Sequence, residues 1–208
     1  MNPHRTITRF AATALVTVAY LALSAASVGC GGGNDTTSSS TTTVVAAFTP
    51  DTPTAADGSI TLLPGTTSGG SVNVRVTVTQ MANFFGAAFR IKYDATALLF
   101  QGPMDTSTSF LPVGITDPAQ LSFVSNSQIS PGEIVITATR IFPAVPVPLV
   151  STTSDLVILN FVARRSIPAG AVEGRLDFAD PKDACNGSVF PCGPITVTAW
   201  KGGGVSAQ

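Results

Sequence analysis

The sequence predicts an all-β domain, a jelly-roll β-sandwich of about eight or nine strands. Three observations support this fold class. Apolar and polar residues alternate with a period of two in several short runs, which is typical of strands with one buried face. Turn-forming residues are frequent, with 19 glycines and 15 prolines in 208 residues, and no segment keeps a helical period. Only 11% of the residues are charged, which suits an exported all-β domain.

Two consecutive segments carry the clearest alternation. In residues 71–81 four valines fall on one face, namely Val72, Val74, Val76 and Val78. In residues 87–93 the inward positions hold Phe89, Ile91 and Tyr93. Polar or small side chains occupy the intervening positions, so each segment is expected to form a strand with one buried face.

The remaining strands are expected in shorter runs that end at turn residues. Residues 59–63 stop at Pro64-Gly65, and Asp94 is expected to cap a single turn before a strand at residues 98–100. The turn Ser130-Pro131-Gly132 precedes a strand at residues 133–140. Further strands are expected at residues 121–125, 155–165, 173–178 and 195–200.

The first 29 residues have the organisation of a secretory signal peptide. Arg5 and Arg9 precede an apolar segment at residues 10–28, and small residues lie before Cys30. The segment ending in Gly29-Cys30 resembles the lipobox of bacterial lipoproteins, which implies cleavage before Cys30, a diacylglyceryl group on its thiol and an acylated new amino terminus. Two alternatives stay open: the apolar segment is just long enough to remain as a membrane-spanning helix, or Cys30 is incidental to an ordinary cleavage site.

The resemblance to lipoproteins also implies a location. Two or three acyl chains hold a protein stably on a membrane, because each buried methylene contributes about 0.8 kcal/mol. In the sorting pattern of that family an Asp after the lipid-bearing Cys retains the protein on the inner membrane, and here that position is Gly31. We therefore expect a lipid-anchored protein of the cell envelope that faces outside the cytoplasm, with the outer membrane or cell surface favoured.

Composition divides the chain into four parts. Residues 1–29 form the signal peptide, and residues 30–50 are expected to form a flexible Gly/Ser/Thr-rich tether. The apolar patch at residues 44–48 is either a first strand or the end of this tether. Residues 51–200 are expected to form one β-sandwich, which is long enough to bury its own core. Residues 201–208 are expected to form a disordered tail.

Charge and cysteine content exclude several classes of partner and cofactor. Without residues 1–29 the chain keeps nine Lys and Arg against 12 Asp and Glu, and it loses its only histidine, His4. This weak acidity lacks the basic face that nucleic acid requires. Cys185 and Cys192 bracket a turn-rich loop and are interpreted as a disulfide formed in an oxidising compartment. A metal site needs about four ligands, so neither a metal nor another cofactor is expected.

The order of these pieces resembles the cohesin domains. Residues 84–100 contain a glycine, an alternating strand, Tyr93-Asp94, a short turn and an apolar run, and this order is similar to the cohesin pattern. Residues 65–74 resemble the opening of that family, and residues 156–163 and 169–178 resemble its later core strands, so the likeness spans about residues 55–200. It implies a nine-stranded jelly-roll sandwich related to cellulose-binding modules. It also implies binding of dockerins, which are small calcium-dependent helical modules.

We do not expect an enzyme. A mature chain without histidine has no Ser-His-Asp or Cys-His arrangement. Its two glutamates, Glu133 and Glu173, each lie beside a turn glycine at the start of a strand. Solvated strand-edge acids explain them better than a carboxylate pair for glycoside hydrolysis.

Two candidate binding surfaces follow from the strand pattern, because protein docking needs only a mixed polar face with some apolar spots. The first is a mild positive patch of outward residues on strands interpreted as neighbours: Asn73, Arg75, Thr77, Arg90 and Lys92. The second is the apolar segment 143–150, with Val145 and Val147, which its prolines keep from forming an inner strand. The plain alternatives are a solvated sheet face for the first and a segment that lies flat across the sandwich edge for the second.

The expected function is a non-catalytic binding module of cohesin type that docks a protein partner, with a dockerin-like module as the partner that the resemblance implies. The first alternative is carbohydrate binding linked to polysaccharide breakdown. It depends on exposed aromatic rings, and the sequence offers Trp200 and Phe190, of which Trp200 is equally well explained as a partly buried strand-end residue. A structural role in the envelope is the second alternative.

Overall fold

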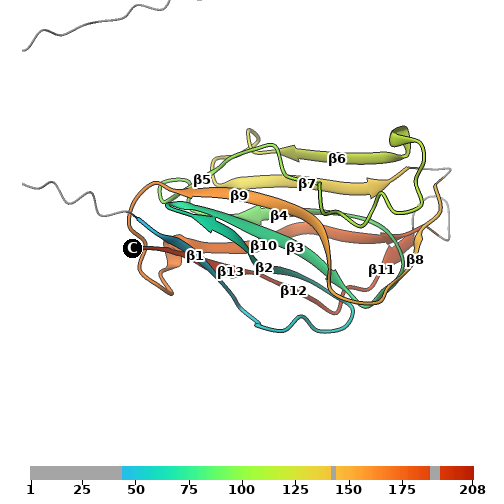
Figure 1. Ribbon diagram of the computed structural model, residues 1–208, viewed down its shortest axis with the longest axis horizontal. Helices are drawn as coiled ribbons and strands as arrows, with labels where there is room; N and C mark the ends of the chain where they lie inside the picture. The colour runs from blue at the N-terminus through green and yellow to red at the C-terminus, as the bar shows by residue number, and fades with distance from the viewer. Residues whose placement is uncertain (1–43, 142–143, 188–192) are drawn as a thin grey trace, which may run out of the picture. The chain divides into compact units, whose positions relative to one another are not determined.

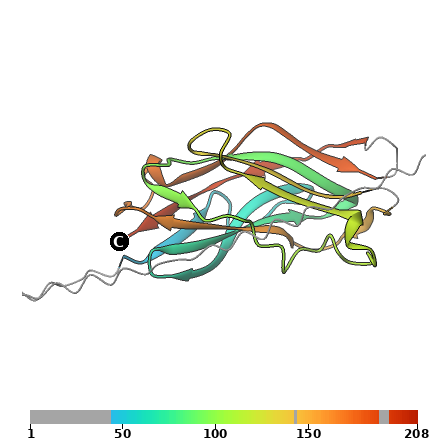
Figure 2. The same cartoon turned by 90° about the horizontal axis from the view of Figure 1, so that it is seen from above.

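Two β-sheets pack face to face in the computed structural model, which describes residues 44–141, 144–187 and 193–208 (Figures 1 and 2). The predicted all-β sandwich is confirmed, since the described residues form thirteen strands and two short 3-10 turns, η1 (Pro118–Gln120) and η2 (Val172–Gly174). The expected eight or nine strands are too few, because short strands of three to five residues at the edges and ends add to the long ones. Within the described residues no helix is long and apolar enough to cross a membrane.

The larger sheet has eight strands. From one edge to the other it contains β1 (Ala46–Pro50), β13 (Gly203–Ala207), β10 (Arg175–Asn186), β4 (Met81–Lys92), β7 (Glu133–Arg140) and β6 (Leu121–Asn126). Two further strands pair beside this path, β11 (Gly193–Ile195) with β10 and β8 (Val147–Val150) with β4.

The smaller sheet has five strands, and its order brings distant segments together. It contains β12 (Ala199–Lys201), β2 (Ser59–Ser68), β3 (Ser71–Thr79), β9 (Ser154–Ala163) and β5 (Leu98–Phe100). β12 runs parallel to β2, whereas the other pairings in this sheet are antiparallel.

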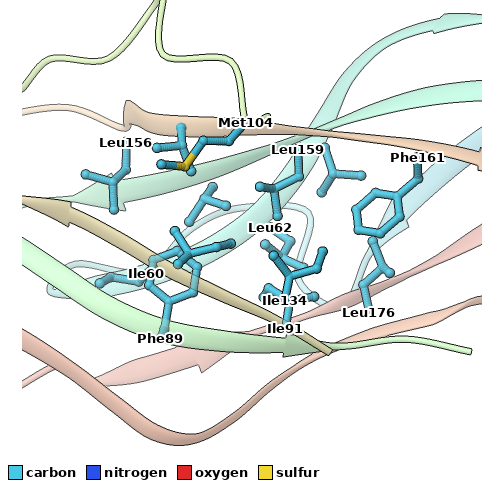
Figure 3. Close-up of a cluster of buried hydrophobic side chains, with 14 of the residues drawn as sticks. Ile60, Leu62, Phe89, Ile91, Met104, Ile134, Leu156, Leu159, Phe161 and Leu176 are labelled. Carbon is cyan, nitrogen blue, oxygen red and sulfur yellow. The ribbon is translucent and has the colours of Figure 1, made fainter. Parts of the chain in front are cut away.

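The core lies between the two sheets and is built from their alternating faces. All four valines of β3 are buried, as the period of two predicts, and so are Phe89 and Ile91 of β4. Figure 3 shows Leu159 and Phe161 of β9 across the core from Ile91 and from Ile134 of β7. Each fully buried side chain of this size contributes about 1.5–3 kcal/mol, so the facing apolar surfaces are the main stabilising force of the sandwich.

A single residue moves the chain from one sheet to the other. β3 ends at Thr79 in the smaller sheet, and β4 begins at Met81 in the larger one. Gln80, between them, has a φ of 49°, in the left-handed region that non-glycine residues seldom adopt. β3 and β4 are therefore consecutive in sequence but belong to opposite layers.

The two ends of the domain differ from the prediction. The expected disordered tail forms β13, and the last residues of the expected tether form β1, which pairs with β13 along its whole length. β1 buries Ala46 and Phe48, and β13 buries Val205 and Ala207. Each strand is short and depends on a partner at the other end of the chain, which a local pattern does not reveal. The domain thus extends to both sides of the predicted range 51–200.

Other strand boundaries also shift. β2 continues through Pro64-Gly65, and a register shift between Pro64 and Thr67 absorbs this break in its pairing with β3. The strand expected at residues 173–178 extends to Asn186, again through a register shift. The segment expected as one strand at residues 195–200 is divided between β11 and β12.

Thr77 lies on the predicted outward face of β3 but is not solvated. Its neighbours Val76 and Val78 both face the core, and it pairs in regular register with Thr61 of β2. Thr77 is nevertheless fully buried. Its hydroxyl donates to the carbonyl oxygen of Thr61 at 3.2 Å, and its Oγ1 lies 2.9 Å from Oγ1 of Thr61. The Thr61 hydroxyl therefore donates to Thr77 in return, and the pair satisfies two buried hydroxyls on this face of the smaller sheet.

We expect Thr77→Val to destabilise the domain by about 1–3 kcal/mol, because it leaves the buried Thr61 hydroxyl without its acceptor. The double variant Thr61→Val with Thr77→Val should recover much of this loss, since it removes both polar groups at once. Chemical denaturation of the two variants measures the difference, with the exposed Thr67→Val as a matched control. A double variant no more stable than Thr77→Val would contradict this account of the pair.

An ion-pair network joins the end of β1 to β10. Asp51 follows β1, and its two carboxylate oxygens accept from Arg175 Nη1 at 2.5 Å and Nη2 at 2.9 Å. Arg175 also donates to Asp177 on its own strand. The hydrogen bond from Arg175 holds the pKa of the Asp51 carboxyl below its ordinary value of 3.8.

Acid should weaken this link. The folded-state pKa of Asp51 lies below the unfolded value of 3.8, so its stabilisation is complete above that pH and is lost as the pH falls through the folded value. Thermal unfolding between pH 7 and pH 2 should show a smaller loss of stability for Asp51→Asn than for the parent chain. Asp57→Asn, in the same segment, is the control, and an identical acid profile for all three chains would exclude the proposed link.

Candidate functional site

The predicted positive patch does not exist as one surface. Asn73 and Arg75 lie on β3 in the smaller sheet, whereas Arg90 and Lys92 lie on β4 in the larger sheet. The crossing at Gln80 sends the outward faces of the two strands to opposite sides of the sandwich. The prediction treated strands that are consecutive in sequence as neighbours, and this assumption is wrong here.

Three members of the predicted patch are also held by polar partners. Arg75 contacts Asp155 on β9, with Nη2 at 2.6 Å from Oδ1. Arg90 pairs with Glu133 on β7. Asn73 donates to the Thr66 hydroxyl at 2.8 Å. These contacts balance the two arginine charges, so neither side of the sandwich gains a positive field from them.

The outer face of the larger sheet has short side chains at its centre. The strand registers place Ala88 on β4 opposite Thr137 on β7 and Asp183 on β10. One step further along β4, Gly86 lies opposite Thr139 and Cys185. We call Gly86, Ala88, Thr137 and Thr139 the small-residue face. Together with Asp183 and Cys185 these residues line a shallow depression of about 150 Å³.

Close approach of β4 and β7 requires glycine at the floor of this depression. A Cβ at position 86 would lie 2.3 Å from Oγ1 and 2.6 Å from Cα of Thr139, and both distances are too short for any side chain. The Thr139 hydroxyl donates to the carbonyl oxygen of Arg140 at 3.0 Å, so it is held within the strand. The floor is consequently flat and rigid.

Charged residues of both signs border the small-residue face at one end and along β10. Lys92 lies between Glu133 and Asp177 in the strand registers, and Arg90 follows it toward the centre. On the β10 side of the face, a register shift after Ala179 displaces residues 180–182 from the regular pairing with β4. This segment carries the Asp180–Lys182 ion pair, whose charged atoms lie 2.5 Å apart. A flat centre of small side chains with a rim that is charged at one end and along β10 is compatible with the anatomy of a protein-binding surface.

The second predicted surface is exposed only in part, and its role in binding stays a prediction. Val145 is 66% exposed, as expected for an apolar contact point, and Leu149 and Val113 are exposed beside it. Val147 instead belongs to β8, pairs with Phe84 at the start of β4 and packs against the core. β8 pairs with β4 alone, so it lies at an edge, which agrees with the prolines in this segment.

Arg140 organises this apolar end of the sandwich. Its side chain is almost fully buried and donates to the carbonyl oxygens of three loop residues, Leu111, Val113 and Val145. Burial lowers the pKa of its guanidinium. These charge-assisted bonds hold two separate loops together, with about 1.5–3 kcal/mol expected for each. Arg140 thus positions Val113 and Val145 without being exposed itself.

Trp200 does not offer a ring to a ligand. Its ring centroid lies 5.0 Å from that of Phe178 and 5.9 Å from that of Phe89, so it packs across the core between the two sheets. The interpretation of Trp200 as a partly buried strand-end residue is therefore the correct one. Its place as a candidate binding residue is withdrawn, since a buried ring cannot stack on a sugar.

Several predicted residues lie outside the described residues. Cys30, Phe190 and Cys192 are among them. Cys185 lies on β10 opposite Pro194 of β11, and its disulfide with Cys192 stays a prediction. In the ranges 44–141, 144–187 and 193–208 no group of three or more His, Cys, Asp or Glu residues is placed to hold a metal ion.

Two structural features of these surfaces were missed at the level of sequence, and each had a signal. The outward positions of β4 and β7 hold Gly86, Ala88, Thr137 and Thr139, where solvated strands usually carry longer polar side chains. Arg140 shares the period of the buried residues Ile134, Ile136 and Ala138, which places it on the inward face. The prediction assigned strand faces from polarity alone. It therefore overlooked the small size of the outward side chains on β4 and β7 and did not place the charged Arg140 on the inward face.

No protein-family model and no curated protein matches this chain. Among solved structures the chain is similar to CaCohA2 from Clostridium acetobutylicum, at 24% identity and a TM-score of 0.47, over 71% of this chain and 88% of that one. It is also similar to the sixth cohesin of scaffoldin B from Acetivibrio cellulolyticus, solved in complex with a Cel5 dockerin, at 19% identity and a TM-score of 0.46, over 75% and 96% of the two chains. A type II cohesin domain from the cellulosome of that organism gives 14% identity and a TM-score of 0.46, over 78% and 94%. Because these TM-scores are below 0.5, the fold assignment rests on the strand order and core of this chain.

Proposed function

We propose that this chain is a non-catalytic docking module of cohesin type, which binds a protein partner on the outer face of β10, β4, β7 and β6. The observation that carries this proposal is the small-residue face with its partly charged rim. Interfaces combine a well-packed centre that excludes water with a polar periphery. A protein surface can approach the backbone of β4 and β7 closely, because no long side chain stands at positions 86, 88, 137 or 139.

The dimensions of this face favour a helical partner. Neighbouring strands lie about 4.8 Å apart, and a helix with its side chains is about 10 Å wide. A helix laid over β4 and β7 would have Asp183 of β10 on one side and Val124 of β6 on the other, since these residues share a row with Ala88 and Thr137. The resemblance of the sequence to cohesins, whose partners are helical dockerins, agrees with this geometry.

Blocking the small-residue face should abolish partner capture. The mature chain from residue 30, with Cys30→Ser for solubility, is used as bait for secreted and envelope proteins of the source organism, in calcium and in EDTA. We expect Ala88→Arg and Thr137→Arg to reduce recovery of the partner about tenfold or more, because each places a long charged side chain at the centre of the face.

Two exposed positions away from this face provide matched controls. Ala56→Arg and Thr67→Arg make the same chemical changes in the 51–58 segment and on β2 of the other sheet. They should leave recovery unchanged, with thermal unfolding showing that all four variants are folded. Capture that survives both face variants would rule out this surface as the docking site.

We further propose that the domain is exported and held at the cell envelope by acyl chains on Cys30. Support comes from the basic, apolar and small-residue segments that precede Cys30 and from the Gly/Ser/Thr-rich residues that follow it. Two or three acyl chains give stable membrane attachment. β1 begins at Ala46, so about fifteen residues separate the proposed anchor from the sandwich, and fully extended they span about 50 Å.

Mass spectrometry of the protein from native membranes tests the anchor. The amino-terminal peptide is expected to begin at Cys30 and to carry the mass of two or three fatty acyl groups, and Cys30→Ser should move the protein from the membrane to the soluble fraction. An intact Met1 or an unmodified thiol at Cys30 would disprove the lipoprotein assignment while leaving the docking proposal untouched.

A further inference from the structure

β6 is an open edge of the larger sheet. It pairs with β7 on one side, and Figure 1 shows no described strand beyond it on the other. It is six residues long, Leu121–Asn126, and contains neither proline nor a charged side chain. Edge strands are normally protected by such residues, by short length or by a covering segment.

The other edges of the sandwich have this protection. β5 and β12, the edges of the smaller sheet, are three residues long. β1, the far edge of the larger sheet, ends in Pro50, and its Ala46 N–H donates to the carbonyl oxygen of Gly69. Among the described edge strands, β6 is therefore the longest and the least protected.

The register identifies which backbone groups of β6 are directed outward. Ile141 donates its N–H to the carbonyl oxygen of Gln120, so this pair is hydrogen-bonded, and bonded pairs recur at every second residue of an antiparallel ladder. Ser122, Val124 and Asn126 therefore bond to β7. Leu121, Phe123 and Ser125 direct their backbone groups to the open edge, except that the Leu121 N–H donates to Pro118.

A groove runs along this open edge. It has a volume of about 410 Å³ and is lined on one side by Phe123, Val124 and Ser125 and on the other by Pro103, Met104 and Thr106. The loop that forms the second side is held by β9, because Asp105 and Ile158 exchange backbone hydrogen bonds of 2.9 and 2.8 Å. The loop thus belongs to the smaller sheet. It touches β6 where the Met104 N–H donates to the Ser125 hydroxyl at 3.4 Å, and the groove lies beside this contact.

We propose that a second copy of this chain occupies the open edge, with the two β6 strands paired antiparallel about a two-fold axis at Phe123. In this arrangement Phe123 pairs with its own copy and Leu121 pairs with Ser125 of the copy. The outward groups then form four hydrogen bonds, two between the Phe123 residues and one from each Ser125 N–H to a Leu121 carbonyl oxygen.

The side chains of β6 are compatible with self-pairing. No like charges meet across the axis, since the strand is uncharged. On the inner side each Phe123, which is only partly buried in one copy, would cover the groove beside Met104 of the other. On the outer side Val124, which is 53% exposed, would lie against Ser122 of the copy. The dimer would therefore bury one exposed valine side chain in each half of the interface.

The axis of such a pair is perpendicular to the sheet, so the outer faces of both copies point to the same side. If the proposed function holds, on which this one consequence rests, the dimer presents two small-residue faces to one partner array. Two linked sites bind a multivalent partner more strongly than either site alone.

Sedimentation of the mature chain with Cys30→Ser tests the pairing, over concentrations from about 1 µM to about 1 mM. We expect a monomer–dimer equilibrium with a dissociation constant of about 10–100 µM, in keeping with a small interface. Val124→Lys and Ser125→Pro should each weaken it about tenfold or more, the first by charge repulsion and the second by removing an outward N–H that β7 does not use. Val172→Lys, at a valine that is 83% exposed on η2, is the matched control and should change nothing.

Charge complementation separates this pairing from other kinds of assembly. A mixture of Val124→Lys with Val124→Glu should restore the dimer, because opposite charges then meet across the axis. A monomer at every concentration would overturn the proposal, as would a dimer that survives both β6 variants in their folded state. Sedimentation reports only the mass of the assembly and needs no partner. A chain that does not dimerise would therefore leave the docking proposal intact, and a chain that does not dock a partner would leave the dimer proposal intact.

Discussion

The change of sheet at Gln80 is the constraint on which the arrangement of the whole domain depends. Its left-handed backbone turns the chain from β3 in one layer to β4 in the other, so the apolar faces of these two strands meet in the core instead of lying side by side. The buried valines of β3 and the buried Phe89 and Ile91 of β4 then need each other to exclude water. The same turn decides which outward residues share a surface, and for that reason the small-residue face combines residues of β4 and β7 and excludes β3.

The outer face of the larger sheet combines a flat centre with a partly charged rim. Its centre is flat because Gly86 allows β4 to approach Thr139 closely, and its rim carries paired charges such as Arg90 with Glu133. A rigid, flat centre reduces the entropy lost on binding, since few side chains there have rotamers to lose. The apolar end held by Arg140 is a separate feature, whereas the open edge of β6 adjoins the small-residue face through Val124, which lies opposite Thr137.

The strands with a strong local pattern were predicted well, whereas features that depend on distant pairing were not. β7 has the predicted bounds, and the valines of β3 lie on the predicted face, because period-two alternation is a local property. β13 was predicted as a disordered tail, and residues 44–48 were left open between a first strand and the end of the tether, because β1 and β13 are each stabilised by the opposite end of the chain. Thr77 lies on the predicted face, but its burial was not predicted, because alternation does not reveal which outward positions other parts of the chain cover. The predicted patch of Arg75 and Arg90 failed for a similar reason, since sequence adjacency does not reveal a change of sheet.

The central claim is that a protein partner binds over β4 and β7. Amide chemical-shift mapping of the isotope-labelled mature chain, titrated with the captured partner, tests this claim most directly. The account predicts that the largest shifts cluster at Gly86, Ala88, Thr137, Thr139 and Asp183, which lie in adjacent rows of one face. Shifts confined to β2, β3 and β9, on the opposite side of the sandwich, would contradict it.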